Sequence, residues 1–174
     1  MEETVNEKAR VGSARNLARD LIKKCKIKEG PISLRTIIAY LQGTHDLGVY
    51  PCANFSDKLS GILVTIEDET SRRDEIHFNQ NHNWHRRRFS IAHEIGHLLF
   101  NTSHSATGSD FNNSQSTDET EANQFASELL MPLAFLKTDL KKAHTTVKDL
   151  AWKYIVSEEA MGWKISTSNL LKYI

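Results

Sequence analysis

The clearest chemical signal in this sequence is a His-Glu-x-x-His pattern formed by His93, Glu94 and His97. On an α-helix, residues four positions apart lie on one face, so the two imidazoles can hold a single zinc ion between them. Glu94 lies beside them, where its carboxylate can take a proton from a water molecule on the metal. The pattern therefore predicts a zinc site with His93 and His97 as ligands and Glu94 as the catalytic base.

The segment around this pattern is expected to be a buried helix that no proline interrupts. The arc that carries the two histidines and Glu94 would face a cleft, and Gly96 leaves room for a close neighbour. Apolar side chains at helical spacing form a different stripe, which would face the core and comprises Trp84, Ile91, Ile95, Leu98 and Leu99.

A catalytic zinc ion normally has three protein ligands and one open position, so the chain must supply one more donor. Glu121 is our candidate, because it lies at the margin of the apolar face of a predicted helix over 118–131. Glu119 falls toward the same side and competes with it. Both glutamates also fit capping-box patterns, in which the carboxylate serves the backbone instead. His104, in the polar loop 101–117, is a further alternative.

Composition limits the possible functions. The 174 residues suffice for one domain with a core, and the 22 basic and 22 acidic residues balance, so no overall field favours nucleic acid. The polar start lacks a signal peptide, and no apolar run is long enough to span a membrane. Arg86-Arg87-Arg88 is expected to be a solvated helix face. Cys25 and Cys52 lack metal-ligand spacing and are expected to be free thiols of a cytoplasmic protein.

The remaining periodicities predict an α+β chain. Three short strands, expected to form a small antiparallel sheet packed on the metal helix, are predicted at 47–55, 59–67 and 75–79. Ser157 is expected to cap the last of the surrounding helices, which are predicted at 13–24, 32–42, 118–131, 145–156 and 158–165. We expect residues 1–174 to form a single domain in which residues 1–12 are disordered.

Two paired motifs resemble the ImmA/IrrE family of metallo-endopeptidases. The first is arginine, an aromatic residue and then Ala-His-Glu within residues 88–94; the second is Glu-Ala-Asn at 121–123, followed by Phe-Ala and Leu-Leu-Met-Pro. The resemblance covers about residues 30–165 and departs where Lys164-Ile165 stands in place of the more common Arg-Leu. It implies a zincin-like fold in which the third zinc ligand is the glutamate of Glu-Ala-Asn, here Glu121.

The resemblance also implies a partner. It suggests a zinc-dependent endopeptidase that cleaves or inactivates a helix-turn-helix repressor of a prophage, mobile element or stress regulon. Nothing before residue 30 is long enough for a helix-turn-helix domain of its own, so a repressor would be met in trans. In this mechanism Glu94 takes a proton from water and later delivers it to the leaving amine.

Two other functions compete with the peptidase. A non-catalytic regulator could bind and sequester a repressor or a toxin-antitoxin partner. Direct DNA binding is not expected, because the segment that faintly resembles a helix-turn-helix, 150–161, lacks a run of arginine or lysine to hold phosphates. No membrane partner is expected. The oxyanion of the transition state needs a further donor, for which the sequence leaves open His82, His85, His104, Tyr40, Tyr50 and His144.

Overall fold

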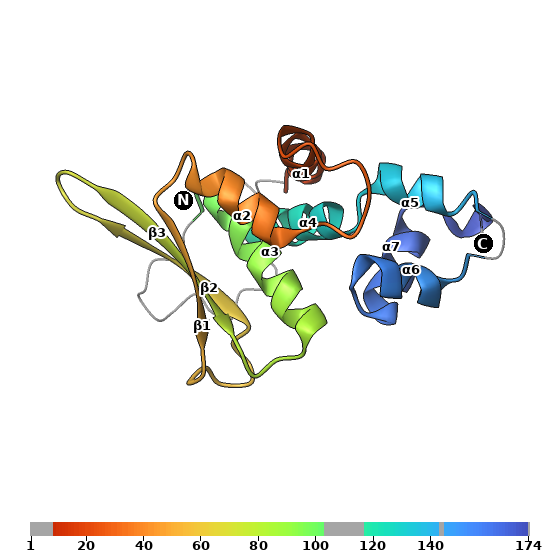
Figure 1. Cartoon of the computed structure of the whole chain (residues 1–174). Helices are drawn as coiled ribbons and strands as arrows, with labels where there is room; N and C mark the ends of the chain where they lie inside the picture. The colour runs from red at the N-terminus through yellow and green to blue at the C-terminus, as the bar shows by residue number, and fades with distance from the viewer. Residues whose placement is uncertain (1–8, 103–116, 143–144, 174) are drawn as a thin grey trace, which may run out of the picture.

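The computed structural model of the chain describes residues 9–102, 117–142 and 145–173. Two helices come first, three strands follow, and the remaining elements are helical (Figure 1). The elements are α1 Val11–Lys24, α2 Leu34–Gln42, β1 Leu47–Cys52, β2 Gly61–Glu67, β3 Arg72–Asn79, α3 Trp84–Phe100, α4 Thr117–Leu130, α5 Leu133–Asp139, α6 Val147–Tyr154, α7 Glu158–Thr167 and the short 3₁₀ helix η1 Leu171–Tyr173.

The α+β class is confirmed, but the predicted antiparallel sheet is in fact mixed. Its strand order is β1-β3-β2; β2 and β3 form an antiparallel hairpin, whereas β1 runs parallel to β3 with Val49 opposite Ile76. The strand directions do alternate along the chain. The parallel pair arises because β3 enters between β1 and β2, which leaves β2 as one edge of the sheet.

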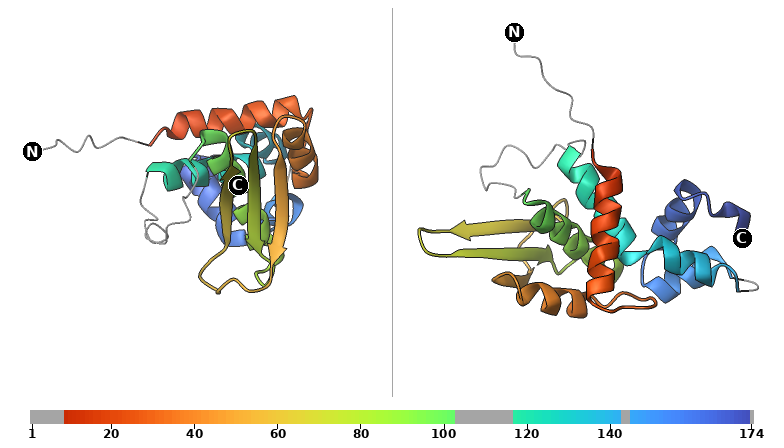
Figure 2. Two further views of the ribbon diagram at one scale, coloured as in Figure 1. Left: turned by 90° about the vertical axis from the view of Figure 1, so that its left-hand side faces the viewer. Right: turned by 90° about the horizontal axis from the view of Figure 1, so that it is seen from above.

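Helix α3 lies between the sheet and α4, and α1 packs on the outer side of α4 (Figures 1 and 2). The approach of α3 to α4 is close at Gly96, where an added Cβ would lie 3.1 Å from Ala122 Cα and 3.2 Å from the Phe125 ring. The close neighbour that we predicted for Gly96 is therefore helix α4.

The burial of α3 differs from the prediction at both of its faces. Ile95 and Leu98 are buried as expected, but Trp84 is 54% exposed. The arc opposite the apolar stripe is covered too, since Glu94 and His97 are also buried. A helix packed between a sheet and a second helix is enclosed on most sides, so the simple division into core face and open face fails.

The arginine triplet at the start of α3 is only in part a solvated face. Arg86 is exposed, but Arg88 is buried and donates from Nη2 to the Ile32 carbonyl oxygen at 3.0 Å. This bond ties the start of α3 to the segment that precedes α2. Burial lowers the pKa of the Arg88 guanidinium.

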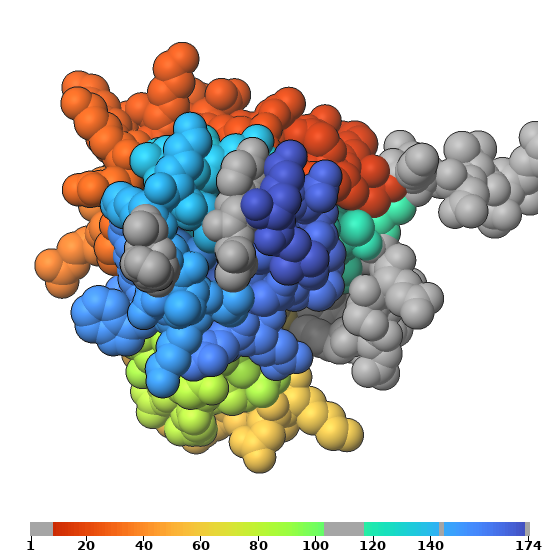
Figure 3. Space-filling model, turned by 90° about the vertical axis from the view of Figure 1, so that its right-hand side faces the viewer, coloured from red at the N-terminus to blue at the C-terminus, as the bar shows by residue number. Residues whose placement is uncertain are grey.

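Helices α5, α6 and α7 form the end of the molecule opposite the sheet, and Figure 3 shows their outer face. Ser157 caps α7 as predicted, with its hydroxyl accepting from the Ala160 N–H. At the other end of the chain, α1 begins at Val11, inside the segment expected to be disordered, of which residues 1–8 lie outside the described residues. Both cysteines are free. Among the described helices, none combines the length and apolar character that crossing a bilayer requires.

Candidate metal centre

Helices α3 and α4 bring together His93, His97 and Glu119. The two imidazole Nε2 atoms are 3.0 Å apart, and the Glu119 carboxylate oxygens lie 3.3 Å from His93 Nε2 and 3.1 Å from His97 Nε2. Ligand atoms about 2.0–2.1 Å from a tetrahedral zinc ion lie about 3.3–3.4 Å from one another. Two imidazoles and one carboxylate at this spacing are a donor set that could hold a metal ion.

The other nitrogen of each imidazole is held by a side chain. His93 Nδ1 lies 3.0 Å from Asn123 Oδ1, and His97 Nδ1 lies 3.0 Å from Thr102 Oγ1. In the tautomer that carries hydrogen on Nδ1, each Nδ1–H donates to its partner oxygen and each Nε2 lone pair faces the common centre. Such second contacts orient the rings that bind a metal.

The structure does not place Glu121 with the histidines: Glu119 lies in the position that we predicted for Glu121 and replaces it as the candidate third ligand. The Glu121 carboxylate is buried and accepts hydrogen bonds from the Arg10 main-chain N–H at 2.6 Å and from its guanidinium at 3.0 and 2.9 Å. Positions 119 and 121 lie about 200° apart around a helix. One side chain consequently faces α3 and the other faces the start of α1.

Glu119 and Glu121 are both kept ionised, but by different neighbouring groups. Burial works against the charged form of Glu119, but the interactions with His93 and His97 outweigh it and hold the pKa of that carboxyl far below its usual range. The hydrogen bonds from Arg10 likewise lower the pKa of Glu121. Both groups are therefore carboxylates near neutral pH, and only Glu119 offers its charge to the two imidazoles.

Glu94 lies on the sheet side of α3, against strand β2. The main-chain N–H of Leu63 lies near enough to its carboxyl group to work against the rise of its pKa, and a Cβ placed on Gly61 would lie 3.2 Å from Oε1. Its Oε2 atom is buried without a hydrogen-bond partner among the described residues. Burial raises the pKa of Glu94 to about 7, the range in which a carboxylate can both accept and return a proton near neutrality.

Sequence reasoning missed the residues that support this centre. Asn123 stands in the Glu-Ala-Asn motif, and its position one turn after Glu119 could have indicated a contact beside the metal ligands. Thr102, Gly61 and Leu63 gave no such signal, because they reach the centre only through the packing of α3 on β2 and the turn that ends α3.

The side chains considered as oxyanion donors lie in varied places. His82 Nε2 is 3.1 Å from a main-chain carbonyl oxygen, and Tyr50 Oη accepts from an arginine at 2.6 Å. Tyr40 is exposed on α2, and His85 lies on α3 two turns before His93. None of these four belongs to the metal group found among the described residues. Two further candidates lie outside those residues: His104, also considered as a ligand, and His144.

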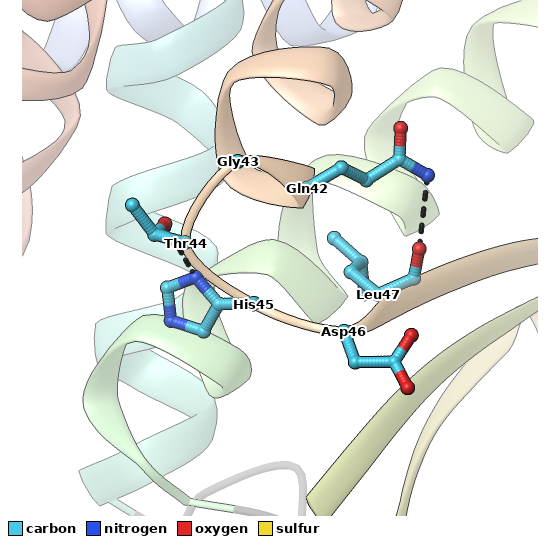
Figure 4. A pocket seen from close by; sticks show the side chains of 6 residues that line it. All are labelled: Gln42, Gly43, Thr44, His45, Asp46 and Leu47. Atoms are coloured by element: carbon cyan, nitrogen blue, oxygen red, sulfur yellow. Dashed lines mark hydrogen bonds between the residues drawn. The ribbon is translucent and has the colours of Figure 1, made fainter.

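A separate hollow lies where α2 leads into β1 (Figure 4). Gln42 Nε2 donates to the Leu47 carbonyl oxygen at 2.9 Å, and Thr44 Oγ1 lies 2.8 Å from His45 Nδ1. These bonds are internal to the turn. We therefore regard this hollow as a feature of the turn between α2 and β1 and not as part of the metal centre.

Comparison with known proteins now identifies the family. The model of the M78 peptidases, described as an IrrE N-terminal-like domain, matches residues 55–166, which is more than half of the chain. The chain belongs to this family. The resemblance seen in the two paired motifs is thereby confirmed, and an M78 domain indicates a hydrolase of the metallopeptidase kind.

A solved structure shares the fold of this chain. A Mycobacterium tuberculosis transcriptional regulator matches 89% of this chain with a TM-score of 0.62 and 16% sequence identity, a level at which the likeness concerns the fold alone. This chain spans 46% of the length of that regulator. The comparison with curated proteins gave no match.

Proposed function

We propose that this protein is a zinc-dependent endopeptidase. The observation that carries the proposal is the group of His93, His97 and Glu119, whose donor atoms lie 3.0–3.3 Å apart, with a buried glutamate, Glu94, next in sequence to the first of them. Membership of the M78 peptidase family supports it. When bound there, zinc supplies Lewis-acid chemistry, in which it activates water as a nucleophile and polarises the scissile carbonyl group.

The protein's own part in the reaction falls to Glu94. Its Oε2 atom has no partner among the described residues and is available to accept the proton of the attacking water. The same carboxyl group then gives the proton to the amine that leaves when the peptide bond breaks.

We propose that the substrate backbone binds along the outer edge of β2. Within the described part of the chain, strand β2 pairs with β3 alone, and it passes Glu94 at Gly61 and Leu63. An extended peptide that adds to this edge would carry its main chain past the metal group. This choice names the edge strand that the sequence located only within residues 47–80.

The proposed substrate is a helix-turn-helix repressor in the cytoplasm. The IrrE-like family supports this choice, and so does the structural neighbour, which is itself a transcriptional regulator. The equal numbers of acidic and basic residues favour a protein partner over DNA. A repressor encoded beside this gene is the first substrate to test.

A Glu94→Gln variant tests the proposal. Glutamine keeps the size of the side chain but cannot accept a proton, so zinc content should stay at wild-type level while repressor cleavage falls by about two to four orders of magnitude. Gel analysis of cleavage and a repressor pull-down should be run together. If the variant still relieved repression as well as wild type, the peptidase hypothesis would fail, and a regulator that sequesters the repressor would be the better explanation.

A further inference from the structure

A second hollow opens beside the metal group, between α3, α4 and α7. Its volume is about 570 Å³, within the range of pockets that bind small molecules or side chains. Phe89 of α3, Asn123 of α4 and Trp163 of α7 each line it. We call it the α7 pocket.

The α7 pocket adjoins the metal group through Phe89 and Asn123. Phe89 lies one turn before His93 on α3, and the two rings have centroids 6.3 Å apart. Asn123 lies one turn after Glu119 on α4 and also contacts His93 Nδ1 at 3.0 Å. The rows of side chains that carry the ligands on both helices therefore continue directly into the pocket walls. A peptide bond held at the metal would have a neighbouring side chain within reach of it.

The walls are suited to an apolar guest. Met131 is buried, Ala160 has a small and partly buried side chain, and Trp163 is 53% exposed although it lines the hollow. Among the described residues that line the pocket, Glu159 is the one charged side chain, and it is exposed. Covering half-exposed aromatic rings with an apolar side chain removes that surface from water.

The wall formed by α7 is also held rigidly. Lys164, next to Trp163, is buried and donates from Nζ to Glu128 Oε2 of α4 at 2.8 Å. Helix α7 is thereby fixed to the helix that carries Glu119. A rigid pocket discriminates between side chains better than one that can adapt to each of them.

We propose that the α7 pocket binds a large apolar or aromatic side chain of the substrate next to the scissile bond, and that Trp163 and Ala160 determine this specificity. The inference rests on the proposed peptidase function and names the class of bond that is cleaved. The expected preference for large apolar over small or charged residues is roughly 10- to 100-fold in kcat/KM.

The test uses the zinc-loaded full chain and a peptide library made from a digested proteome, with cleaved bonds mapped by mass spectrometry. One position beside the cleaved bond should be enriched in Phe, Leu, Met or Tyr. Ala160→Phe fills the pocket and should shift that position toward Ala and Ser, and Trp163→Ala should weaken the preference by about tenfold. Trp152→Ala is the matched control, since Trp152 on α6 is 85% exposed and does not line the pocket.

Three results would overturn the inference: no enrichment at any position, enrichment of basic or acidic residues, or the same enrichment in wild type and in both pocket variants. If wild type cleaves no peptide, the peptidase proposal fails. The pocket proposal is then tested separately by measuring peptide binding. Two fluorescein-labelled decapeptides of Ser and Gly, with a single Phe or a single Ala, serve as probes in anisotropy titrations. Tighter binding of the Phe peptide that is lost in Ala160→Phe supports the pocket, and equal binding rejects it.

Discussion

Glu128 of α4 and Lys164 of α7 form an ion pair of 2.8 Å in which both side chains are almost fully buried. The other carboxylate oxygen of Glu128 accepts from Arg19 Nε at 2.8 Å and from the Leu133 N–H at 3.2 Å. One buried carboxylate thus connects α4 to α1, to the start of α5 and to α7. Since α4 also carries Glu119, this pair links the C-terminal helices to the metal centre.

Removing one partner of this pair should be costly. Lys164→Met leaves the Glu128 carboxylate buried without its main counter-charge, and we expect a loss of about 3–5 kcal/mol in the free energy of unfolding. Urea denaturation of the two proteins measures it. Arg19→Ala is the comparison: its side chain is 46% exposed, so about 1 kcal/mol or less should be lost. Similar small losses in both variants would show that the buried pair does not hold the helices.

The choice of Glu119 over Glu121 can be tested by metal content. Glu119→Ala should lose most of its zinc, because one of three ligands is gone. Glu121→Ala should keep its zinc and instead lose about 1–3 kcal/mol of stability, because the hydrogen bonds from Arg10 disappear. Metal analysis and urea denaturation of each variant separate the two roles. The opposite pattern would restore Glu121 as the ligand.

The contact between α3 and α4 at Gly96 should tolerate no larger residue. In Gly96→Ala the new Cβ would lie 3.1 Å from the main chain of α4, so the helices must separate, and we expect a loss of about 1–3 kcal/mol. Zinc affinity should fall as well, because Glu119 moves with α4. Gly162→Ala is the matched control in α7, where nothing lies within 4 Å, and it should gain up to about 1 kcal/mol. Equal effects of the two changes on thermal denaturation would contradict this view of the interface.

Asp139 should make the stability of the fold depend on pH in the acidic range. Burial raises the pKa of its carboxyl, but hydrogen bonds from Lys142, Lys153 and Tyr154 outweigh burial and lower the pKa to about 2. The usual value is 3.8, so the contribution is complete above about pH 4 and is lost as the pH falls toward 2. Urea denaturation between pH 5 and pH 3, with a chelator present, should show a steeper loss of stability in wild type than in Asp139→Asn. Parallel curves would mean that Asp139 does not titrate in this range.

The sequence by itself determined the elements and the chemistry that are local in the chain. The pattern of His93, Glu94 and His97 needs only one helix to bring its side chains together, and apolar periodicity locates that helix. The same local signals located α1, α2, α4, α6 and α7, the strands β2 and β3 and the cap at Ser157, but they missed the short helix α5. The family followed from two short motifs for the same reason.

Only the tertiary structure decided how these elements face one another. Glu119 and Glu121 are two positions apart on one helix, and which of them meets the histidines depends on where α3 and α1 pack. Arg10, which donates hydrogen bonds to the Glu121 carboxylate, lies 111 positions from Glu121 in the sequence. The parallel pairing of β1 with β3 and the wall that Trp163 adds beside the metal are likewise long-range contacts. Periodicity gives the direction of a side chain around its own helix, but the partner on that side is set by packing between distant segments.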